Sequence, residues 1–320
     1  MRLNSRRRLR RSALCVAALA LALPATACDS QGDGDDSGKQ SSSPSPSEES
    51  IFDSSVSVGV KKGQPGFNTK SGYDYAGFET ALVQRLSDYT PFKDYDLGDL
   101  PSLQREKILR GGGKDLVVAT YSITPQRDKE VDFTVPYFKS DQGLLVAKDE
   151  DRIKRLQDLK GKRVCTASGS TSDPGGADDD KAAKEVRQAL GEGVEPLTRD
   201  DYKQCVQDLI KGGNFDAVWT DKIVLEGFAH AKPYADHVRV LPDITVGKRQ
   251  YYGVGLREGH TEDCRKLNRA LKEFLDKDWP TTFRSYFPEL AEKQDFVQTY
   301  RPSPGEYADL ERDSCGANDD

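Results

Sequence analysis

The chain has 320 residues, of which 31% are charged, and its formal net charge at pH 7 is −6. This length exceeds what one hydrophobic core usually serves, so the sequence favours two folded lobes. Residues 1–27 contain six arginines and no acidic residue, and without them the net charge is −12, which argues against a nucleic acid as the partner.

Residues 1–27 have the three parts of a secretory signal peptide. A basic stretch is followed by an apolar run over 13–23 and by small residues before Cys28. The run has 11 residues, whereas a membrane-spanning helix needs about 20. Residues 23–28 resemble a bacterial lipobox, with alanine where leucine is usual, so we expect Cys28 to be lipidated. Residues 5–9 also fit a twin-arginine signal, which leaves the export route open.

Residues 28–50 are predicted to form a disordered tether. The segment is rich in Asp, Gly, Ser, Pro and Glu and has no large apolar side chain, so burial cannot repay the entropy of folding. We expect folded structure to begin near Ile51. Such a tether lets a lipid-anchored domain reach its ligand and a membrane partner.

Beyond Ile51, apolar periodicity predicts strands and helices that alternate along the chain. This order is typical of an α/β fold, and no repeat of solenoid length is present. The expected strands are 56–60, 115–119, 143–147, 162–166, 215–220 and 249–256. The expected helices are 78–86, 103–110, 181–190, 202–211, 264–275 and 279–286, with a short helix or turn at 153–159 and a polar tail at the end.

The cysteines predict two disulfides. Of six cysteines, Cys15 leaves with the signal peptide and Cys28 carries the lipid, so four remain in an exported domain, where disulfides form. Four cysteines can pair in three ways. We expect neighbours along the chain to pair, Cys165 with Cys205 and Cys264 with Cys315. Because no cysteines have CxxC spacing and only three histidines occur, we expect neither a metal site nor a cofactor.

The first motif with binding chemistry extends from Thr120 to Arg127, directly after the buried strand predicted at 115–119. Ligands of open α/β sheets bind at the carboxyl ends of strands. The motif offers hydroxyl groups, free backbone groups and a guanidinium, whose planar fork pairs with a carboxylate through two hydrogen bonds. The alternative is an arginine in an exposed turn.

The segment continues with Val131-Asp132-Phe133 and Pro136-Tyr137-Phe138. Together with Ser122–Arg127, these residues resemble the signature of the extracellular solute-binding protein family 3, the amino-acid receptors of ABC importers. The resemblance extends from about Val56 to Phe287.

The resemblance implies a two-lobed α/β fold of the periplasmic-binding-protein type II class. Two chain crossovers, near 137–144 and 240–249, would form a hinge that closes when a ligand bridges the lobes. The implied boundaries are 51–140 and 244–297 for the first lobe, 141–243 for the second lobe and 298–320 for a C-terminal tail.

In this family the first lobe supplies an arginine for the ligand α-carboxylate, a hydroxyl residue five positions earlier and a backbone carbonyl seven positions earlier. The matching residues are Arg127, Ser122 and Thr120. From the second lobe, Val164–Thr171 resembles the family's strand and Ser-Gly-Ser-Thr turn, which implies contacts from Ser170 and Thr171. Such a turn otherwise has no binding role.

The run Asn214–Asp221 resembles the family's strand that ends in an aspartate for the ligand α-ammonium. We favour Asp221 over Asp216, because Asp216 lies at the start of the predicted strand and Asp221 just beyond its carboxyl end. The alternative role for Asp221 is an N-cap of the helix that begins near Ile223.

The amino-acid sequences of several segments, including Val58–Gly66, resemble those of actinobacterial glutamate-binding lipoproteins. This suggests glutamate as the ligand, with aspartate or glutamine next. Lys61 lies where such receptors often place a basic residue for the side-chain carboxylate, although it could also be a solvated loop lysine. Arg105 is a second candidate. An aromatic ring is expected to pack over the ligand stem, but the sequence assigns none, and Phe67 stays only a possibility.

The expected protein is thus a monomeric, lipid-anchored binding protein that delivers an amino acid to an ABC importer permease. An enzyme on the same fold, such as a periplasmic dehydratase, is one alternative. It is weakly supported, since the histidines His230, His237 and His260 lie outside the motifs and are expected at the surface. A sensory protein for a separate receptor is the other alternative, and the neighbouring genes would discriminate between transport and sensing.

Overall fold

Two separate five-stranded sheets form the framework of the fold. The computed structural model describes residues 49–176, 180–212 and 214–316. The strands of the first sheet have the order β4-β1-β5-β14-β6. Strand β1 pairs in parallel with β4 and β5, and β14 pairs antiparallel with β5 and β6. Their bounds are β1 Val56–Val60, β4 Tyr95–Asp99, β5 Leu116–Val118, β6 Asp132–Phe133 and β14 Gly255–Leu256.

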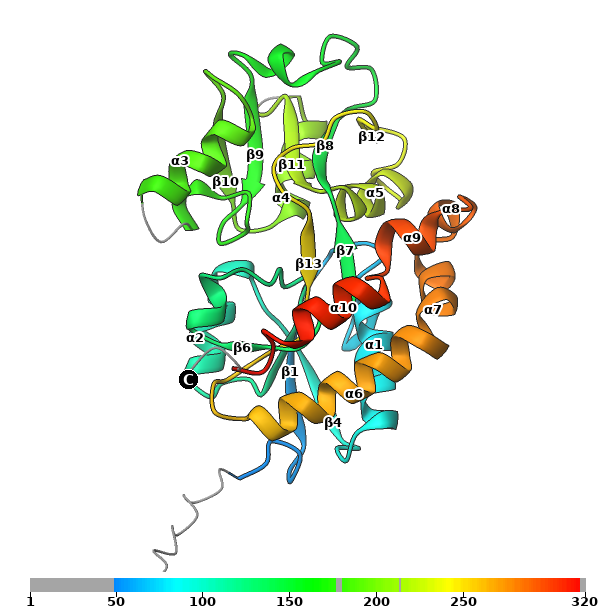
Figure 1. The fold of residues 1–320 in the computed structure, drawn as a ribbon. Coiled ribbons are helices and arrows are strands. Elements are labelled where there is room, and N and C mark those ends of the chain that lie inside the picture. Colours follow the sequence, from blue (N-terminus) through cyan, green and yellow to red (C-terminus); the bar gives the residue numbers. More distant parts are fainter. Residues whose placement is uncertain (1–48, 177–179, 213, 317–320) are drawn as a thin grey trace, which may run out of the picture. The chain divides into compact units, whose positions relative to one another are not determined.

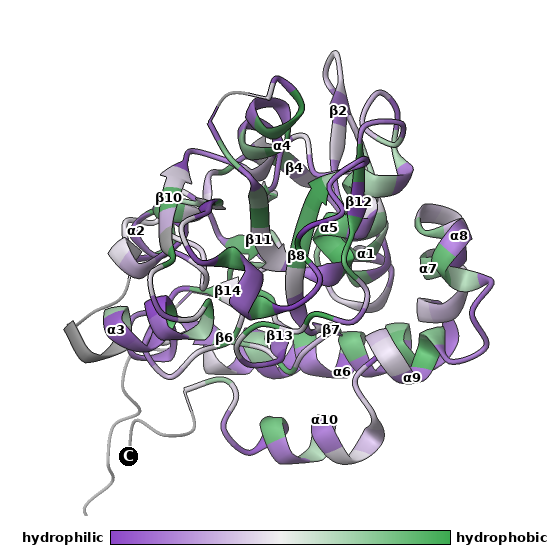
Figure 2. Cartoon of the chain, turned by 90° about the horizontal axis from the view of Figure 1, so that it is seen from above, coloured by the Kyte–Doolittle hydropathy of each residue, from purple (hydrophilic) through white to green (hydrophobic). Residues whose placement is uncertain are grey.

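The second sheet has the order β10-β9-β11-β8-β12. Strand β9 pairs in parallel with β10 and β11, whereas β8 pairs antiparallel with β11 and β12. Figure 2 shows β8 and β11 as largely hydrophobic strands in the middle of this sheet, as expected for strands covered on both faces. The bounds are β8 Gln142–Ala147, β9 Arg163–Ala167, β10 Glu195–Arg199, β11 Ala217–Asp221 and β12 Val238–Val240.

Helices cover both sheets, and each helix predicted from the sequence is present. Their bounds are α1 Phe78–Tyr89, α2 Arg105–Arg110, α3 Asp180–Ala189, α4 Tyr202–Ile210, α5 Lys222–His230, α6 Thr261–Lys277 and α7 Trp279–Tyr286, with short 3₁₀ helices η1 Ser102–Gln104, η2 Arg127–Lys129, η3 Leu156–Leu159 and η4 Pro174–Gly176. Within the described ranges, none of these helices is both long enough and apolar enough to cross a membrane.

The chain passes between the two sheets twice, which confirms the two-lobed fold. Strands β7 (Phe138–Ser140) and β13 (Gln250–Tyr252) run side by side between the sheets (Figure 1) and pair antiparallel, with Tyr251 opposite Lys139. We refer to the first sheet with its helices as lobe 1, to the second sheet with its helices as lobe 2, and to β7 and β13 as the hinge strands.

The C-terminal segment differs from the polar tail expected from the sequence. It contains three short helices, α8 (Pro288–Ala291), α9 (Phe296–Tyr300) and α10 (Pro304–Glu311). Tyr307 anchors α10 by donating a hydrogen bond of 3.0 Å to the carbonyl of Asn268 in α6. The sequence pattern also missed the hairpin of β2 (Thr69–Ser71) and β3 (Asp74–Ala76), because its residues are almost all exposed and show no apolar alternation.

Both expected disulfides are present. Cys165 in β9 bonds to Cys205 in α4, and Cys264 in α6 bonds to Cys315 after α10. The predicted signal peptide, the lipidation site Cys28 and the tether up to residue 48 lie outside the described residues.

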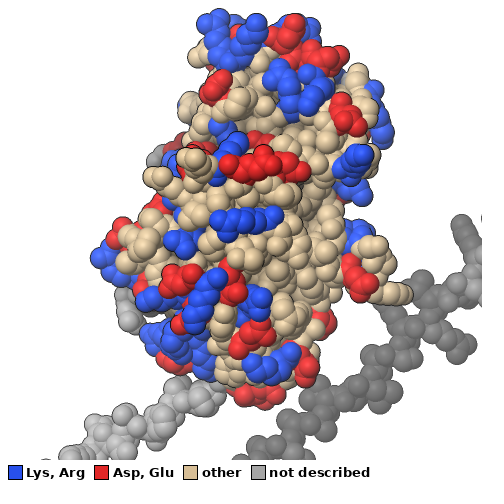
Figure 3. Space-filling model, turned by 90° about the vertical axis from the view of Figure 1, so that its right-hand side faces the viewer, with Lys and Arg blue, Asp and Glu red and all other residues tan. Residues whose placement is uncertain are grey.

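At the N-terminal end of the described chain, the hydroxyl of Ser50 donates a 2.8 Å hydrogen bond to Asp263. Anchoring to α6 therefore begins one residue before Ile51. On the face drawn in Figure 3, acidic and basic side chains are interspersed, and no large area carries a single sign of charge.

Candidate functional site

A small cavity lies between the lobes. Its volume is about 10 Å³, which is room for about one water molecule. Seven of the eight predicted ligand-binding residues line it, namely Arg105, Thr120, Ser122, Arg127, Ser170, Thr171 and Asp221. The structure therefore brings together residues up to 116 positions apart in sequence, and it does so at the ends of strands from both sheets.

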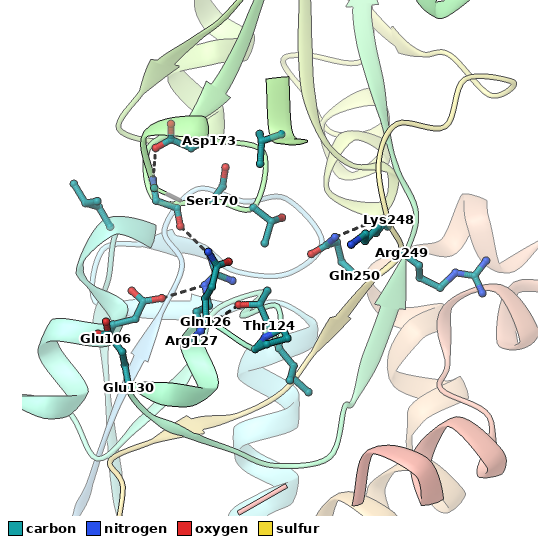
Figure 4. A pocket seen from close by; sticks show the side chains of 17 residues that line it. Glu106, Thr124, Gln126, Arg127, Glu130, Ser170, Asp173, Lys248, Arg249 and Gln250 are labelled. Atoms are coloured by element: carbon teal, nitrogen blue, oxygen red, sulfur yellow. Dashed lines mark hydrogen bonds and ion pairs between the residues drawn. The ribbon is translucent and has the colours of Figure 1, made fainter. Parts of the chain in front are cut away.

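A wider pocket of about 460 Å³ adjoins this cavity and shares Arg127 with it. Figure 4 shows that Arg127 points from lobe 1 toward the loop of lobe 2 that carries Ser170 and Asp173. Asp173 fixes that loop by accepting a 2.8 Å hydrogen bond from the backbone N–H of Gly169.

The guanidinium of Arg127 makes three polar contacts. It donates to the carbonyl of Ser122 at 2.9 Å and to the carbonyl of Gly169 at 3.0 Å, and it pairs with the carboxylate of Glu106 at 3.1 Å. Burial and the nearby charge of Arg105 lower the pKa of Arg127 to about 10. Two cations this close in a buried site favour an anion between them.

Arg105 also spans the two lobes. Its side chain donates to the carbonyls of Ser102 and Ala119 at 3.1 and 3.2 Å, and to the carbonyl of Gly169 at 3.1 Å. Both guanidinium groups lie over the ring of Tyr121, with centroid distances of 4.4 Å for Arg105 and 5.2 Å for Arg127. This cation–π support holds the two charges side by side.

Thr120 has a strained backbone at the end of β5. Its φ of +42° lies in the left-handed region, which costs a threonine of order 1–3 kcal/mol. The carboxylate of Glu79 holds this conformation by accepting hydrogen bonds of 2.5 Å each from the N–H of Thr120 and the hydroxyl of Tyr137. Burial raises the pKa of Glu79 to about 7.

Asp221 is the last residue of β11 and presents an unsatisfied oxygen. The hydroxyl of Tyr252 donates to Oδ2, whereas Oδ1 is buried and has no hydrogen-bond partner among the described residues. Burial raises the pKa of this carboxyl to about 6. Asp221 occupies the N-cap position of α5 but makes no side-chain capping bond. The capping role weighed from the sequence is therefore absent.

Asp216 lies at the opposite end of the same strand. It accepts a 2.8 Å hydrogen bond from the N–H of Arg163 and does not line the cavity. In the structure Asp216 directly precedes the first residue of β11 and Asp221 is its last residue.

Lys61 is buried one hydroxyl group away from the cavity. Its ammonium donates to the hydroxyl of Ser102, which lines the cavity. Only 8% of Lys61 is exposed, so it is not a solvated loop lysine. Burial, followed by repulsion from Arg105, lowers its pKa well below the ordinary value.

Several residues around the cavity were missed by the sequence reasoning. Tyr202 lines the cavity from the first turn of α4, and Gln142 orients Thr171 through a 3.1 Å hydrogen bond. Neither lies in a motif, and each reaches the cavity only through the packing of lobe 2. The signal for Tyr202 was its position directly after Asp201, which caps α4 by accepting from the N–H of Gln204.

One possibility that the sequence left open is not realised, and one expectation for another residue was wrong. Phe67 belongs to the lobe 1 core, where its ring packs against those of Phe78, Phe138 and Phe287, and it does not line the cavity. His260, expected at the surface, is only 6% exposed. Within the part of the chain that is described, no group of histidine, cysteine and acidic residues is spaced to hold a metal ion.

The arrangement of the two lobes and the cleft matches a known family. The family model for bacterial extracellular solute-binding proteins, family 3, matches residues 56–289. The chain belongs to this family. Membership agrees with the two disulfides, which are typical of proteins outside the cytosol, and with polar side chains that converge on one cleft from both lobes.

Similar family 3 proteins cover most of the chain. The glutamate-binding protein GluB of Corynebacterium efficiens is 32% identical over 273 residues, which are 81% of this chain and 87% of the relative. GluB of Corynebacterium glutamicum is 34% identical over 235 residues, or 70% and 75% of the two chains. A solved structure of an ancestral arginine-binding protein bound to arginine is 29% identical, with a TM-score of 0.62 over 73% of this chain and 98% of that one.

Proposed function

We propose that this protein is the lipid-anchored, extracellular substrate-binding subunit of an ABC importer, and that it binds an amino acid between its lobes. Glutamate is the proposed ligand, with aspartate or glutamine next. The observation that carries the proposal is the pair of opposite charges on one cavity: the guanidinium of Arg127 from lobe 1 and the unsatisfied Oδ1 of Asp221 from lobe 2.

These two groups suit the charged groups that all amino acids share. The guanidinium of Arg127 pairs with the α-carboxylate of the ligand, and the hydroxyls of Ser170 and Thr171 donate hydrogen bonds to the same carboxylate. Oδ1 of Asp221 accepts from the α-ammonium, which satisfies an oxygen that otherwise remains buried without a partner. Ser122 and the carbonyl of Thr120 supply further polar contacts on the lobe 1 side.

The cations at the cavity support an acidic side chain on the ligand. Arg105 and Arg127 line the cavity, and Lys61 lies one hydroxyl group away. Among the described residues Asp221 is the one carboxylate on the cavity surface, and Glu106, which pairs with Arg127, lies outside it. A second carboxylate, contributed by the ligand, offsets the repulsion between the cations and raises the pKa of Lys61 back toward its ordinary value.

Ligand binding and lobe closure use the same donors. Arg105 and Arg127 both donate to the carbonyl of Gly169 across the interlobe gap. When the lobes separate, these donors lose that oxygen and become available to an anion. A bound zwitterion then draws lobe 2 back through Asp221, and the closed form is what a permease recognises.

The anchoring part of the proposal rests on the N-terminal sequence. Cleavage before Cys28 and its lipidation would place the protein at the outer face of the cell membrane, where we propose that it acts as a monomer. The tether that follows gives the lobes freedom to meet the permease.

The test is isothermal titration of the ligand-stripped protein with glutamate, aspartate, glutamine and asparagine. Glutamate is expected to bind most tightly, and Arg127→Ala is expected to abolish binding. Arg269→Ala, which removes an exposed arginine of α6, is the matched control and is expected to bind normally.

A second pair of variants tests the ligand side chain. Lys61→Gln is expected to lower the affinity for glutamate much more than the affinity for glutamine. Lys62→Gln changes a neighbouring side chain that is 65% exposed, and it is expected to leave both affinities unchanged. If no amino acid binds, the proposal is refuted and the sensory and enzymatic alternatives are favoured.

A further inference from the structure

The carboxylate of Glu306 in α10 contacts both hinge strands at once. Its Oε2 accepts a 2.8 Å hydrogen bond from the ammonium of Lys139 in β7, and its Oε1 accepts a 2.7 Å hydrogen bond from the hydroxyl of Tyr251 in β13. Lys139 and Tyr251 are directly paired across the two strands. One side chain thus joins the two crossovers of the chain.

Glu306 itself is held firmly on α10. It forms a capping box with Ser303, in which its carboxylate accepts a 2.8 Å hydrogen bond from the N–H of Ser303, and the hydroxyl of Ser303 accepts from the N–H of Glu306. Burial alone would raise the pKa of Glu306, but hydrogen bonds, first of all from Lys139, lower it to about 2. The carboxylate is therefore charged at any physiological pH.

Helix α10 is fastened to lobe 1. Cys315, which follows the helix, is disulfide-bonded to Cys264, and its N–H donates a 2.9 Å hydrogen bond to the carbonyl of Phe133 in β6. Tyr307 and Ser314 both bond to Asn268 of α6, at 3.0 Å each. Figure 1 shows α10 lying across lobe 1 next to the hinge strands. Glu306 therefore ties the hinge to lobe 1.

The partner of Glu306 in β7 is a buried cation. The side chain of Lys139 is 6% exposed, and Glu306 is its one acceptor among the described contacts. A buried ammonium that loses its carboxylate is strongly unfavourable, so this contact persists while the hinge moves.

A different contact joins the crossovers on the lobe 2 side. Asp141 and Arg249 form an ion pair of 2.8 Å just beyond the last paired residues of the hinge strands. Their side chains are 36% and 45% exposed, so this pair is weaker and more easily broken than the buried one. Of these two ion pairs between the crossovers, the one on the lobe 1 side is therefore the stronger.

We propose that Glu306 is a positioning residue of the hinge, which keeps Lys139 and Tyr251 on lobe 1 and confines opening to the segments beyond Ser140 and before Gln250. By limiting how far lobe 2 opens, it raises the fraction of molecules that can close on a ligand, without touching the ligand. The inference concerns the hinge and holds for whichever solute the cleft binds.

The test measures the interlobe distance in the ligand-free full chain. Noncanonical residues at the exposed positions Lys272 in α6 and Gln188 in α3 carry a fluorophore pair for single-molecule energy transfer, which leaves the native cysteines unlabelled. Glu306→Gln is expected to shift the distribution toward longer distances and to broaden it. Release of bound glutamate, followed by stopped flow, is expected to be about tenfold faster.

A second, milder variant separates an effect on the hinge from a general folding defect. Tyr251→Phe removes a single hydroxyl and is expected to shift the distances in the same direction by a smaller amount. Glu311→Gln, which changes an exposed acid on the same helix, is expected to match the parent protein. If Glu306→Gln and Tyr251→Phe lower only the melting temperature and leave the ligand-free distances unchanged, the hinge role is refuted. Because those distances need no ligand, this result is separate from a failure of the proposed function.

Discussion

Arg127 in lobe 1 donates a 3.0 Å hydrogen bond to the carbonyl oxygen of Gly169 in lobe 2. Arg105 donates to the same oxygen at 3.1 Å. One backbone oxygen of lobe 2 thus occupies two cationic donors of lobe 1. Any anion that enters the cleft must take over these donors, which couples binding directly to the approach of the two lobes.

Gly169→Ala is expected to prevent full closure of the cleft. A Cβ at this position would lie 2.5 Å from Cα of Leu103 in lobe 1, and φ is +72°. Because Cα of Leu103 belongs to the backbone, it cannot rotate away from the added Cβ. The ligand affinity is therefore expected to fall about 100-fold or more, which corresponds to roughly 2.7 kcal/mol of binding free energy. Isothermal titration measures the affinity.

The matched control for this variant is Gly161→Ala. Gly161 has a similar φ of +75°, but nothing lies within 4 Å of the added Cβ. It imposes the same backbone strain without the interlobe collision, so it is expected to lower the melting temperature and to leave affinity unchanged. An equal loss of affinity in both variants would show that closure is not obstructed at Gly169.

Asp221→Asn is expected to weaken binding and yet to stabilise the ligand-free protein. The pKa of Asp221 is raised by burial from 3.8 to about 6, so the folded state binds a proton more tightly than the unfolded state. The contribution of protonated Asp221 to the free energy of unfolding is fully present below about pH 4 and is lost as pH rises through about 6. This contribution is on the order of 3 kcal/mol. Thermal unfolding at pH 4 and pH 7.5 is the measurement, and the gain should appear only at the higher pH.

Asp216→Asn provides the control on the same strand. Asp216 accepts from the N–H of Arg163 and lies away from the cavity, so this variant is expected to bind ligand normally and to gain no stability at pH 7.5. A destabilised Asp221→Asn protein at pH 7.5 would contradict the account of Oδ1 as an unsatisfied oxygen.

Glu79→Ala is expected to reduce affinity although Glu79 does not line the cavity. Its carboxylate accepts from Thr120, Tyr137 and Asn68, and its loss leaves three buried donors unpaired at about 1–3 kcal/mol each. Thr120 then loses the contact that holds its left-handed backbone beside the ligand. Urea unfolding and titration with glutamate measure both effects.

Glu79→Gln should recover part of both losses, because an amide oxygen still accepts from Thr120 and Tyr137. Asp88→Ala, on an exposed side chain of the same helix, is expected to change affinity little. Normal glutamate binding by Glu79→Ala would refute the positioning role of Glu79.

Removal of the Cys165–Cys205 disulfide by paired serine substitutions is expected to loosen the lobe 2 side of the cleft. This bond ties β9 to α4, and these elements lead into the Ser170 loop and carry Tyr202. The free energy of unfolding is expected to fall by about 2–5 kcal/mol, and amide exchange over residues 166–171 should accelerate. Removal of the other disulfide, Cys264–Cys315, should leave exchange in that segment unchanged; faster exchange in both variants would indicate a general loss of stability.

Much of the lobe 1 and lobe 2 framework could be predicted from local patterns. Alternating apolar residues predicted β1 at its observed bounds, and helical spacing predicted α7. Edge strands such as β4 and β10 were missed, because their residues are partly exposed and their pairing depends on distant neighbours. The placement of α10 was missed for the same reason, since its anchors, Asn268 and the hinge strands, are remote in sequence.

By itself, the sequence determined the order of the main helices and strands and the motifs that carry Arg127 and Asp221, and it predicts an export signal, because each depends on residues that are close together along the chain. Only the tertiary structure decided that Arg105 and Arg127 share the oxygen of Gly169, that Oδ1 of Asp221 is unsatisfied, and that Glu306 joins the hinge strands. The physical reason is that hydrogen bonds and desolvation depend on distance in space, and packing brings these groups together from segments that no local pattern relates.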